Sequence, residues 1–155
     1  MDNMKGFGMM IHALKESPKT IVFTEGTDER ILEAASRLLA GSFLTPILVG
    51  NKEAVLEAAE KYGYNIRGGE IIDPDDYERF DEMVELFCEL RKSKGVTPEQ
   101  AAKTLKSNNY FGTMLVKMGV ADSRYRTSGT SADQDQTGIK LCIFLLHFGS
   151  SVSYR

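Results

Sequence analysis

Three cationic side chains lie close together in the middle of the chain, Arg91, Lys92 and Lys94 in the stretch RKSKG. A guanidinium can hold two oxygens of one phosphate group at once, so Arg91 is the best candidate of the three for an anion-binding residue. A simpler interpretation places these cations in the last turn of a helix, where they interact favourably with its negative end. The spacing of the residues leaves both interpretations open.

The stretch Glu25-Gly26-Thr27 is a second candidate, because it follows an apolar run and precedes a helical pattern. Open α/β sheets bind ligands at the carboxyl ends of their strands, where helix amino termini favour anions. The stretch matches neither G-x-G-x-x-G nor G-x-x-x-x-G-K-[ST], and the charge of Glu25 would repel a phosphate. We therefore favour a simple turn between a strand and a helix.

Other residue types that could do chemistry are sparse. His12 and His147 lie near opposite ends of the chain, with no visible carboxylate or cysteine partner in the sequence. Cys88 and Cys142 are far apart and have no metal-ligand spacing, so we interpret both as small buried apolar residues. The residues by themselves predict no metal site and no catalytic side chain.

The composition disfavours several classes of partner. The 155 residues include 19 Lys and Arg against 22 Asp and Glu, a net charge of -3 that provides no general attraction to nucleic acid or to an anionic membrane. Tyr110-Phe111 lacks the basic surroundings of a nucleic-acid groove and favours packing. The longest apolar run, residues 141–146, is far shorter than the roughly 20 residues of a membrane-spanning helix. Since no signal-peptide pattern is present, we expect a protein of the reducing cytoplasm, without nucleic-acid or membrane partners.

The elements that must position Arg91 follow from the periodicity of apolar residues. Runs rich in β-branched residues at 20–23 and 45–49 predict buried strands, and residues 71–72 predict a short third strand. The helix after the first strand is expected to be capped by Thr27 and stopped by Gly41. Strand and helix alternate, which predicts a three-layer α/β/α fold with a mostly parallel sheet.

Four more helical signals follow along the chain. Residues 53–62 predict a helix ended by a glycine, and Asp75 is a candidate cap for a long helix that ends near the cationic cluster. The sequence Thr-Pro-Glu-Gln at residues 97–100 is a capping box with proline at the first helical position. Residues 110–118 predict a last helix closed by glycine.

The last segment differs in composition from the rest. Residues 123–155 contain six serines, against five in residues 1–122, and no glutamate. They carry four Lys and Arg against two Asp, whereas residues 1–122 carry 15 against 20. Neither the helical nor the strand periodicity of apolar residues is clear in residues 123–138, although residues 139–148 could form one strand. We predict an α/β domain at residues 1–122 and a divergent segment at 123–155 that is out of frame or poorly ordered.

Several stretches of the sequence resemble the phosphate acetyltransferase (phosphotransacetylase) family over residues 19–122. The similar stretches are TIVFTEGTDERILEAASRLL, PILVGN, IIDPDDYERFDEMVELFCELRKSKGVTPEQA and NYFGTMLVKMG. The resemblance implies the N-terminal part of such a protein and an incomplete fold like that of isocitrate and isopropylmalate dehydrogenases. It also implies transfer of an acetyl group between phosphate and coenzyme A, with coenzyme A as a substrate and no permanently bound cofactor or metal.

The resemblance gives the cationic cluster a role, because the family's arginine in ELRKxKG binds substrate and corresponds to Arg91. It implies acetyl phosphate, phosphate and coenzyme A as partners, and a homodimer for the intact enzyme. The family's thiol-activating aspartate lies in a C-terminal half that this chain does not contain, so we expect little activity from the chain alone. After Asp122 the family's VSGAxHSTADTxRP-like loop is absent, and no further residue is carried over.

Two alternatives remain open at this point. A phosphate butyryltransferase differs mainly in its acyl pocket, which this sequence does not reveal. A non-catalytic remnant of the fold, or an interaction domain, would explain the lack of a general base.

Overall fold

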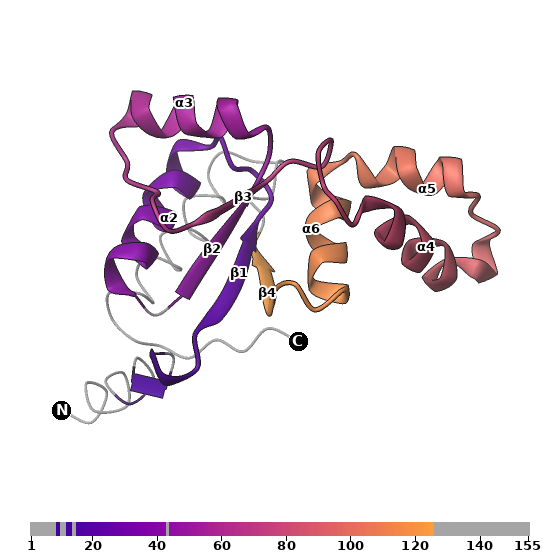
Figure 1. Ribbon diagram of the computed structural model, residues 1–155, viewed down its shortest axis with the longest axis horizontal. Coiled ribbons are helices and arrows are strands. Elements are labelled where there is room, and N and C mark those ends of the chain that lie inside the picture. Colours follow the sequence, from indigo (N-terminus) through magenta and orange to yellow (C-terminus); the bar gives the residue numbers. More distant parts are fainter. Residues whose placement is uncertain (1–8, 10–11, 14, 43, 126–155) are drawn as a thin grey trace, which may run out of the picture.

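The computed structural model describes residues 9, 12–13, 15–42 and 44–125 of the chain. In this part, four parallel strands form one sheet in the order β3-β2-β1-β4. The strands are β1 (Lys19–Phe23), β2 (Leu44–Val49), β3 (Glu70–Ile72) and β4 (Ser123–Tyr125). Helices flank both faces of this sheet, which confirms the predicted α/β architecture with a parallel sheet (Figure 1).

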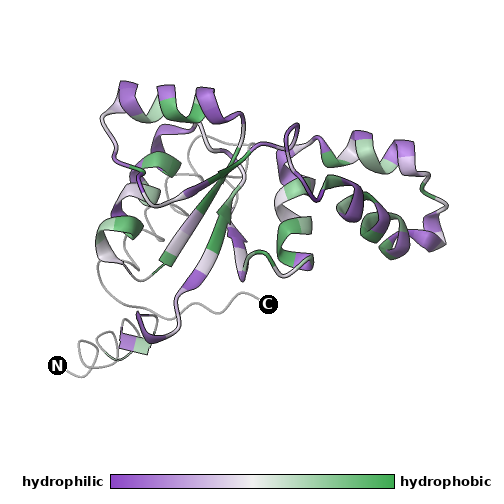
Figure 2. Ribbon diagram, in the orientation of Figure 1, coloured by the Kyte–Doolittle hydropathy of each residue, from purple (hydrophilic) through white to green (hydrophobic). Residues whose placement is uncertain are grey.

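The two central strands bury side chains on both of their faces. Successive side chains of a strand point to opposite faces, so Val22 and Val49 join one core while Phe23 and Leu48 join the other. All four are at most 2% exposed. Figure 2 shows β1 and β2 hydrophobic towards their carboxyl ends, where these residues lie. Because both faces are buried, the strands are continuous apolar runs rather than alternating ones.

Two helices cover one face and three lie on the side of the other (Figure 1). The first face packs against α2 (Glu29–Gly41) and α3 (Lys52–Tyr62). On the opposite side, α6 (Asn108–Lys117) packs on the sheet, and α4 (Phe80–Leu90) and α5 (Pro98–Leu105) extend outward beyond it. The short 3-10 helix η1 (Lys92–Lys94) joins α4 to α5.

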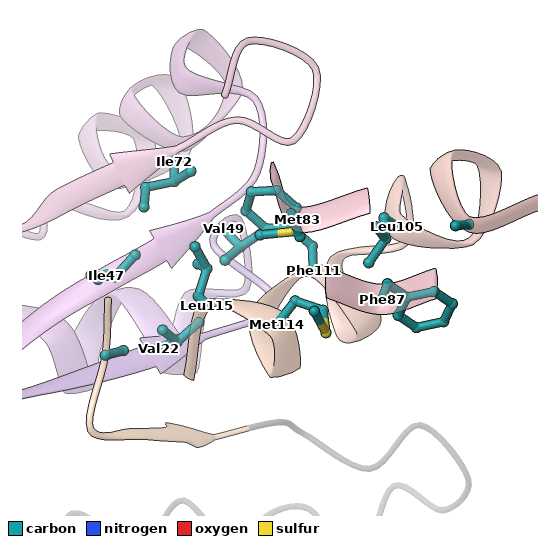
Figure 3. Packing of buried hydrophobic residues seen from close by; sticks show 12 residues of the cluster. Val22, Ile47, Val49, Ile72, Met83, Phe87, Leu105, Phe111, Met114 and Leu115 are labelled. Atoms are coloured by element: carbon teal, nitrogen blue, oxygen red, sulfur yellow. The ribbon is translucent and has the colours of Figure 1, made fainter. Parts of the chain in front are cut away.

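The core on the α6 side connects the sheet to the outer helices. In Figure 3, Phe111 and Leu115 of α6 lie between the strand residues and Phe87 of α4. Phe111 is fully buried, and its ring meets that of Tyr77 edge to face at a centroid distance of 5.2 Å. The position of α6 on the sheet therefore determines where α4 lies.

A glycine allows α6 to approach β1 closely. A Cβ atom at Gly112 would stand 2.6 Å from Thr24 Cγ2 and 3.2 Å from Val22 Cγ1, so any side chain here would push the helix from the strand. Thr24 is 2% exposed, and its hydroxyl has no hydrogen-bond partner among the described residues. The methyl group of Thr24 thus occupies the space that a side chain at position 112 would need.

The predicted helix starts are partly confirmed. The capping box is present as expected, because Gln100 N donates to Thr97 Oγ1 at 3.3 Å and Thr97 N donates to Gln100 Oε1 at 3.2 Å. The expected cap at Thr27 is wrong. Asp28 caps α2 instead, accepting from Arg30 N at 2.9 Å, and the Arg30 guanidinium holds the same carboxylate in place at 3.0 and 2.8 Å.

The expected stop at Gly41 is displaced by one residue. Gly41 is the last residue of α2, and Ser42 adopts the left-handed conformation at φ 54°. By contrast, Gly63 ends α3 as predicted, at φ 75°, with its N–H bonded to the last turn. A serine can follow the helix because its hydroxyl also reaches the Leu39 carbonyl at 3.4 Å.

The expected cap at Asp75 is also wrong. Helix α4 begins only at Phe80, and Arg79 before it makes no side-chain cap. The segment ahead of it closes a turn on Asp73, whose carboxylate accepts from Asp75 N at 2.9 Å. The Asp75 carboxylate instead pairs with Lys106 at 2.7 Å, so it ties the end of α5 to this turn.

One strand was missed by the sequence analysis. Residues 123–125 (SRY) form β4 and pair in parallel with Ile21 to Phe23 of β1. Three mostly polar residues give no periodic signal, and the pairing depends on the exposed edge of a strand 100 residues earlier. The possible strand at 139–148 lies outside the described residues.

Candidate anion-binding site

Arg91 stands directly after the last residue of α4. Its backbone N–H donates to the Phe87 carbonyl at 3.0 Å, and its guanidinium lies 5.6 Å from the centre of the Phe87 ring. The chain then turns through η1 to Gly95, which adopts φ 63°. Lys92 and Lys94 are exposed in η1, whereas Arg91 is half-buried. Arg91 therefore differs from its two cationic neighbours in burial, because the turn at the end of α4 leaves both lysines exposed to solvent.

Arg91 lines a pocket of about 380 Å³, which we call the α6 pocket. The end of α4, one face of α6 and strand β4 form its walls. Its lining residues are Phe87, Leu90, Arg91, Asn109, Tyr110, Thr113, Met114, Lys117 and Arg124.

The charge of the α6 pocket is of one sign. Arg91, Lys117 and Arg124 all line it, and no carboxylate lines it among the described residues, although the whole chain has a net charge of -3. Arg124 is held by Asn109, since its Nη1 donates to the side-chain oxygen and, at 3.2 Å, to the backbone carbonyl. A concave site lined by like charges raises the local concentration of the opposite ion, here an anion.

The other walls of the pocket are aromatic and aliphatic. The rings of Phe87 and Tyr110 meet edge to face at a centroid distance of 6.3 Å. Leu90 is 53% exposed and Tyr110 43%, both high for large apolar side chains. The pocket thus suits an anion that carries an organic group. Within the described part of the chain, no Asp, Glu, His or Cys lines the pocket to accept a proton near neutral pH.

A second hollow, of about 670 Å³, lies at the carboxyl ends of β2 and β3, and we call it the strand-end hollow. It shares no lining residue with the α6 pocket. Five carboxylates and two cations are among its residues, which are Asn51, Lys52, Glu53, Glu70, Ile71, Ile72, Asp73, Asp76, Tyr77, Glu78 and Arg79.

The arginine of the strand-end hollow, Arg79, is already paired with a carboxylate. Arg79 donates two hydrogen bonds to Glu82, at 2.8 and 2.6 Å, and these bonds lower the pKa of that carboxyl. Burial raises the pKa of the neighbouring Tyr77. Within the described chain, no group of three or more His, Cys, Asp or Glu is arranged to hold a metal ion. The excess of carboxylates makes this hollow a poor anion site.

The turn at residues 25–27 serves the fold. Gly26 N donates to the Val49 carbonyl at 3.1 Å, and a Cβ atom at Gly26 would stand 2.9 Å from that oxygen. The glycine is needed for this close approach to β2, and its N–H is not available to a ligand. The interpretation as a simple strand-to-helix turn agrees with this geometry.

None of the other candidates that the structure describes lines the α6 pocket. His12 is exposed and lies 3.7 Å from Glu16 Oε1, so the expectation that it has no carboxylate partner is wrong; the partner lies one helical turn away. Cys88 is half-buried and packs against the core on the α6 side. Asp122 accepts from Thr20 N at 2.8 Å, which fixes the entry to β4. His147 and Cys142 lie outside the described residues.

Two cations of the pocket were missed by the sequence analysis. Asn109, Thr113 and Lys117 recur every four residues in NYFGTMLVKMG, and this spacing could have predicted a polar stripe ending in a cation. Arg124 gave no such signal, because only the pairing of β4 with β1 places it beside α6. In the part of the chain that the structure describes, no helix is long and apolar enough to cross a membrane.

Comparison with known proteins gives consistent matches. The model of the phosphate acetyl/butaryl transferase family matches residues 8–135. A phosphate acetyltransferase of Bacillus subtilis (strain 168) is 48% identical over 102 residues, which are 66% of this chain and 31% of that protein. One from Thermoanaerobacterium thermosaccharolyticum is 44% identical over 113 residues, 73% of this chain and 34% of that protein.

Solved structures agree with the sequence matches. A phosphotransacetylase from Streptococcus pyogenes superposes with a TM-score of 0.75 at 40% identity, covering 92% of this chain and 43% of that one. A phosphotransacetylase from Staphylococcus aureus gives 0.74 at 36% identity, covering 90% and 42%. The chain spans about a third of the length of the curated relatives it matches.

Proposed function

This chain belongs to the phosphate acetyl/butaryl transferase family, and we propose that its α6 pocket binds the phosphate group of phosphate and acetyl phosphate. The reaction we propose for the whole protein is acetyl-CoA + phosphate = CoA + acetyl phosphate. The observation that carries this proposal is the grouping of Arg91, Lys117 and Arg124 in one pocket whose described lining includes no carboxylate. Arg91 is the proposed substrate-binding residue.

The chemistry explains why cations are needed. In the direction of acetyl-CoA formation, the thiolate sulfur of coenzyme A attacks the carbonyl carbon of acetyl phosphate. The new C–S bond forms, the C–O bond to phosphate breaks, and phosphate leaves with the electron pair. Arg91 would hold the phosphate oxygens through its planar fork and balance the charge that grows as they leave.

The proton of the thiol must go to a base, and the described lining of the α6 pocket supplies none. A positioned base contributes about 10²- to 10⁴-fold to a rate. We therefore expect this chain by itself to bind phosphate but to transfer acetyl groups slowly or not at all. Ordinary turnover of acetyl phosphate and coenzyme A by the purified chain would contradict this expectation.

The acyl group is a separate question. We propose acetyl transfer because the matched relatives are named phosphate acetyltransferases. A phosphate butyryltransferase is the alternative. The apolar walls formed by Phe87, Leu90 and Met114 leave room for a butyryl group. Competition of acetyl phosphate and butyryl phosphate for the pocket would separate the two, since a longer acyl chain gains only where apolar surface is buried.

Further parts of the proposal concern the whole protein. We propose that coenzyme A is a substrate and not a resident cofactor, that the protein acts in the cytoplasm, and that the intact enzyme is a homodimer. The resemblance to the family supports each of these. Sedimentation of the purified protein would test the dimer.

The central test is a phosphate titration of this chain, followed by the amide shifts of its NMR spectrum. Arg91→Ala removes a charge-assisted contact of about 1.5 to 3 kcal/mol, so we expect a roughly 10- to 150-fold loss of affinity for phosphate and acetyl phosphate. Arg91→Lys should recover part of the loss because it keeps the charge without the fork.

Lys94→Ala is the matched control, because Lys94 lies three residues away at the same helix end but does not line the pocket. It should change the affinity less than about 2-fold. Equal losses for Arg91→Ala and Lys94→Ala would show that both act only as cations at a helix end. The proposed function would then be wrong.

A further inference from the structure

We infer that Lys117 is a second anion-binding residue of the α6 pocket and holds phosphoryl oxygens from the α6 wall, opposite the α4 end that carries Arg91. The inference rests on the proposed function and extends it to a residue on another element. Lys117 is the last residue of α6 and is exposed.

The two faces of α6 have different partners. Phe111, Gly112 and Leu115 are buried towards the sheet. Asn109, Thr113 and Lys117 line the pocket instead. Since a helix rises 1.5 Å per residue, successive members of this polar stripe are about 6 Å apart along the axis. Lys117 is the charged end of the stripe.

The side-chain oxygens of the two neutral residues in the stripe are already engaged. Thr113 Oγ1 donates to the Asn109 carbonyl at 2.9 Å, and the Asn109 side-chain oxygen accepts from Arg124. The Thr113 hydroxyl hydrogen is therefore not available to a ligand, and part of the Arg124 guanidinium is in use. The stripe leaves Lys117 as its strongest free donor.

Arg91 and Lys117 share one further property. Neither forms an ion pair with any carboxylate among the described residues. Some cations elsewhere in the fold do so, as in the pair of Arg37 with Glu33 at 2.6 Å, whereas others, such as Lys52 and Lys103, do not, so the missing ion pair matters here only because both side chains line one pocket. Two unpaired cations that line one pocket favour an anion from solution as their common partner.

The two residues would act differently on the same anion. The guanidinium of Arg91 is a rigid fork and fixes the orientation of a phosphoryl group, whereas the ammonium of Lys117 is a point charge on a flexible stem. Lys117 would thus add affinity without orienting the ligand. The phosphoryl group could belong to an acyl phosphate or to the diphosphate of coenzyme A, which carry the same oxygens.

A structural role for Lys117 is the competing explanation. A cation in the last turn of a helix interacts favourably with its negative end. Lys103 has this position in α5 but does not line the pocket, so Lys103→Ala is a matched control for Lys117→Ala. Only a ligand-binding role makes the two variants differ in anion affinity.

The experiment titrates the whole chain with inorganic phosphate and, separately, with inorganic pyrophosphate as a probe for a diphosphate. Lys117→Ala should weaken binding of at least one anion about 2- to 5-fold, Lys117→Arg should retain it, and Lys103→Ala should leave it unchanged. The difference should shrink in 1 M salt, where the screening length falls to about 3 Å. A loss confined to pyrophosphate assigns Lys117 to the diphosphate, and a loss with phosphate assigns it to the acyl phosphate.

Thermal unfolding of each variant provides a readout that is independent of the ligand. Unchanged affinity for both anions in Lys117→Ala, with a loss in Arg91→Ala, would overturn this inference and leave the proposed function intact. Equal losses in Lys117→Ala and Lys103→Ala would also overturn it, because a general charge effect would explain them. If Arg91→Ala has no effect either, the proposed function fails as well.

Discussion

The α6 pocket and the strand-end hollow are built on the same sheet but differ in charge and in how their side chains are used. The strand-end hollow occupies the edge where open α/β sheets usually bind ligands, yet it holds five carboxylates and its Arg79 is paired with Glu82. The α6 pocket lies to the side, between α6 and the end of α4, and holds three cations. Side-chain charge therefore favours the α6 pocket as the proposed anion site, whereas position on the sheet would favour the strand-end hollow.

The helices explain why the two hollows differ. The strand-end hollow is formed mainly by the ends of β2 and β3 and by the turns that follow them. Two of these turns are joined there by a hydrogen bond of 2.9 Å from the Asn51 side-chain amide to the Asp73 carboxylate. The α6 pocket requires α4, α6 and β4 to meet. Its residues come from three separate elements, so it depends on the packing of the core on the α6 side and on the pairing of β4 with β1.

Charge reversal in the two hollows should give the largest contrast. Arg91→Glu removes the fork and places a negative charge beside the phosphate, so we expect affinity for phosphate to fall more than about 100-fold. Arg79→Glu in the strand-end hollow should change it less than about 2-fold. Phosphate titrations followed by NMR measure both, and comparable losses would remove the distinction between the hollows.

Gly112→Val should come next, because it acts on the packing that creates the α6 pocket. The new side chain would collide with Thr24 Cγ2, 2.6 Å from the Cβ position, and we expect a loss of about 3 kcal/mol in the free energy of unfolding. Urea denaturation measures the loss. Amide shifts should change around Lys117 more than around Asp76, and unaltered stability would show that α6 does not need this close approach.

Shortening the chain tests β4 and the predicted domain boundary together. A chain that ends at Asp122 lacks β4, including the bond from Thr24 N to the Tyr125 carbonyl at 3.3 Å and the contact of Tyr125 with Phe23. We expect it to be about 1 to 2 kcal/mol less stable than a chain that ends at Tyr125, and to bind phosphate more weakly. Equal stability of the two chains would support a domain that ends at residue 122.

The smallest effect should come from the pH dependence at Asp28, on the face opposite the α6 pocket. Its hydrogen bonds with the Arg30 side chain lower the pKa of the carboxyl below its ordinary value of 3.8. A lowered pKa means that this contribution is complete above pH 3.8 and is lost as the pH falls through the lower native value.

Because the carboxyl of Asp28 is partly exposed, the contribution should stay below about 1 kcal/mol. Asp28→Asn keeps a side chain that can cap α2 and should remove this part of the acid dependence. Acid unfolding curves of the two proteins measure the difference. Phosphate binding at neutral pH should be the same in both, and a change would link this helix start to the α6 pocket.

Local signals in the sequence determined much of the fold. Strands β1 and β2, the capping box at Thr97 and the end of α3 at Gly63 were all predictable, because periodicity, capping and turn preferences act over a few residues. The same local rules misplaced the cap of α2. Thr27 and Asp28 are both good caps, and in the structure it is Asp28 that caps α2 and also binds the Arg30 guanidinium.

The candidate site also has one residue that the sequence predicted and others that only the structure revealed. The sequence itself supplied Arg91, through its residue type, its motif and the resemblance of that motif to a family. The tertiary structure alone decided that Lys117 and Arg124 share its pocket, and that Lys92 and Lys94 do not. Which cations meet depends on the packing of α6 against β1 and on the pairing of β4, and these contacts join residues about 100 positions apart, beyond the range of any local pattern.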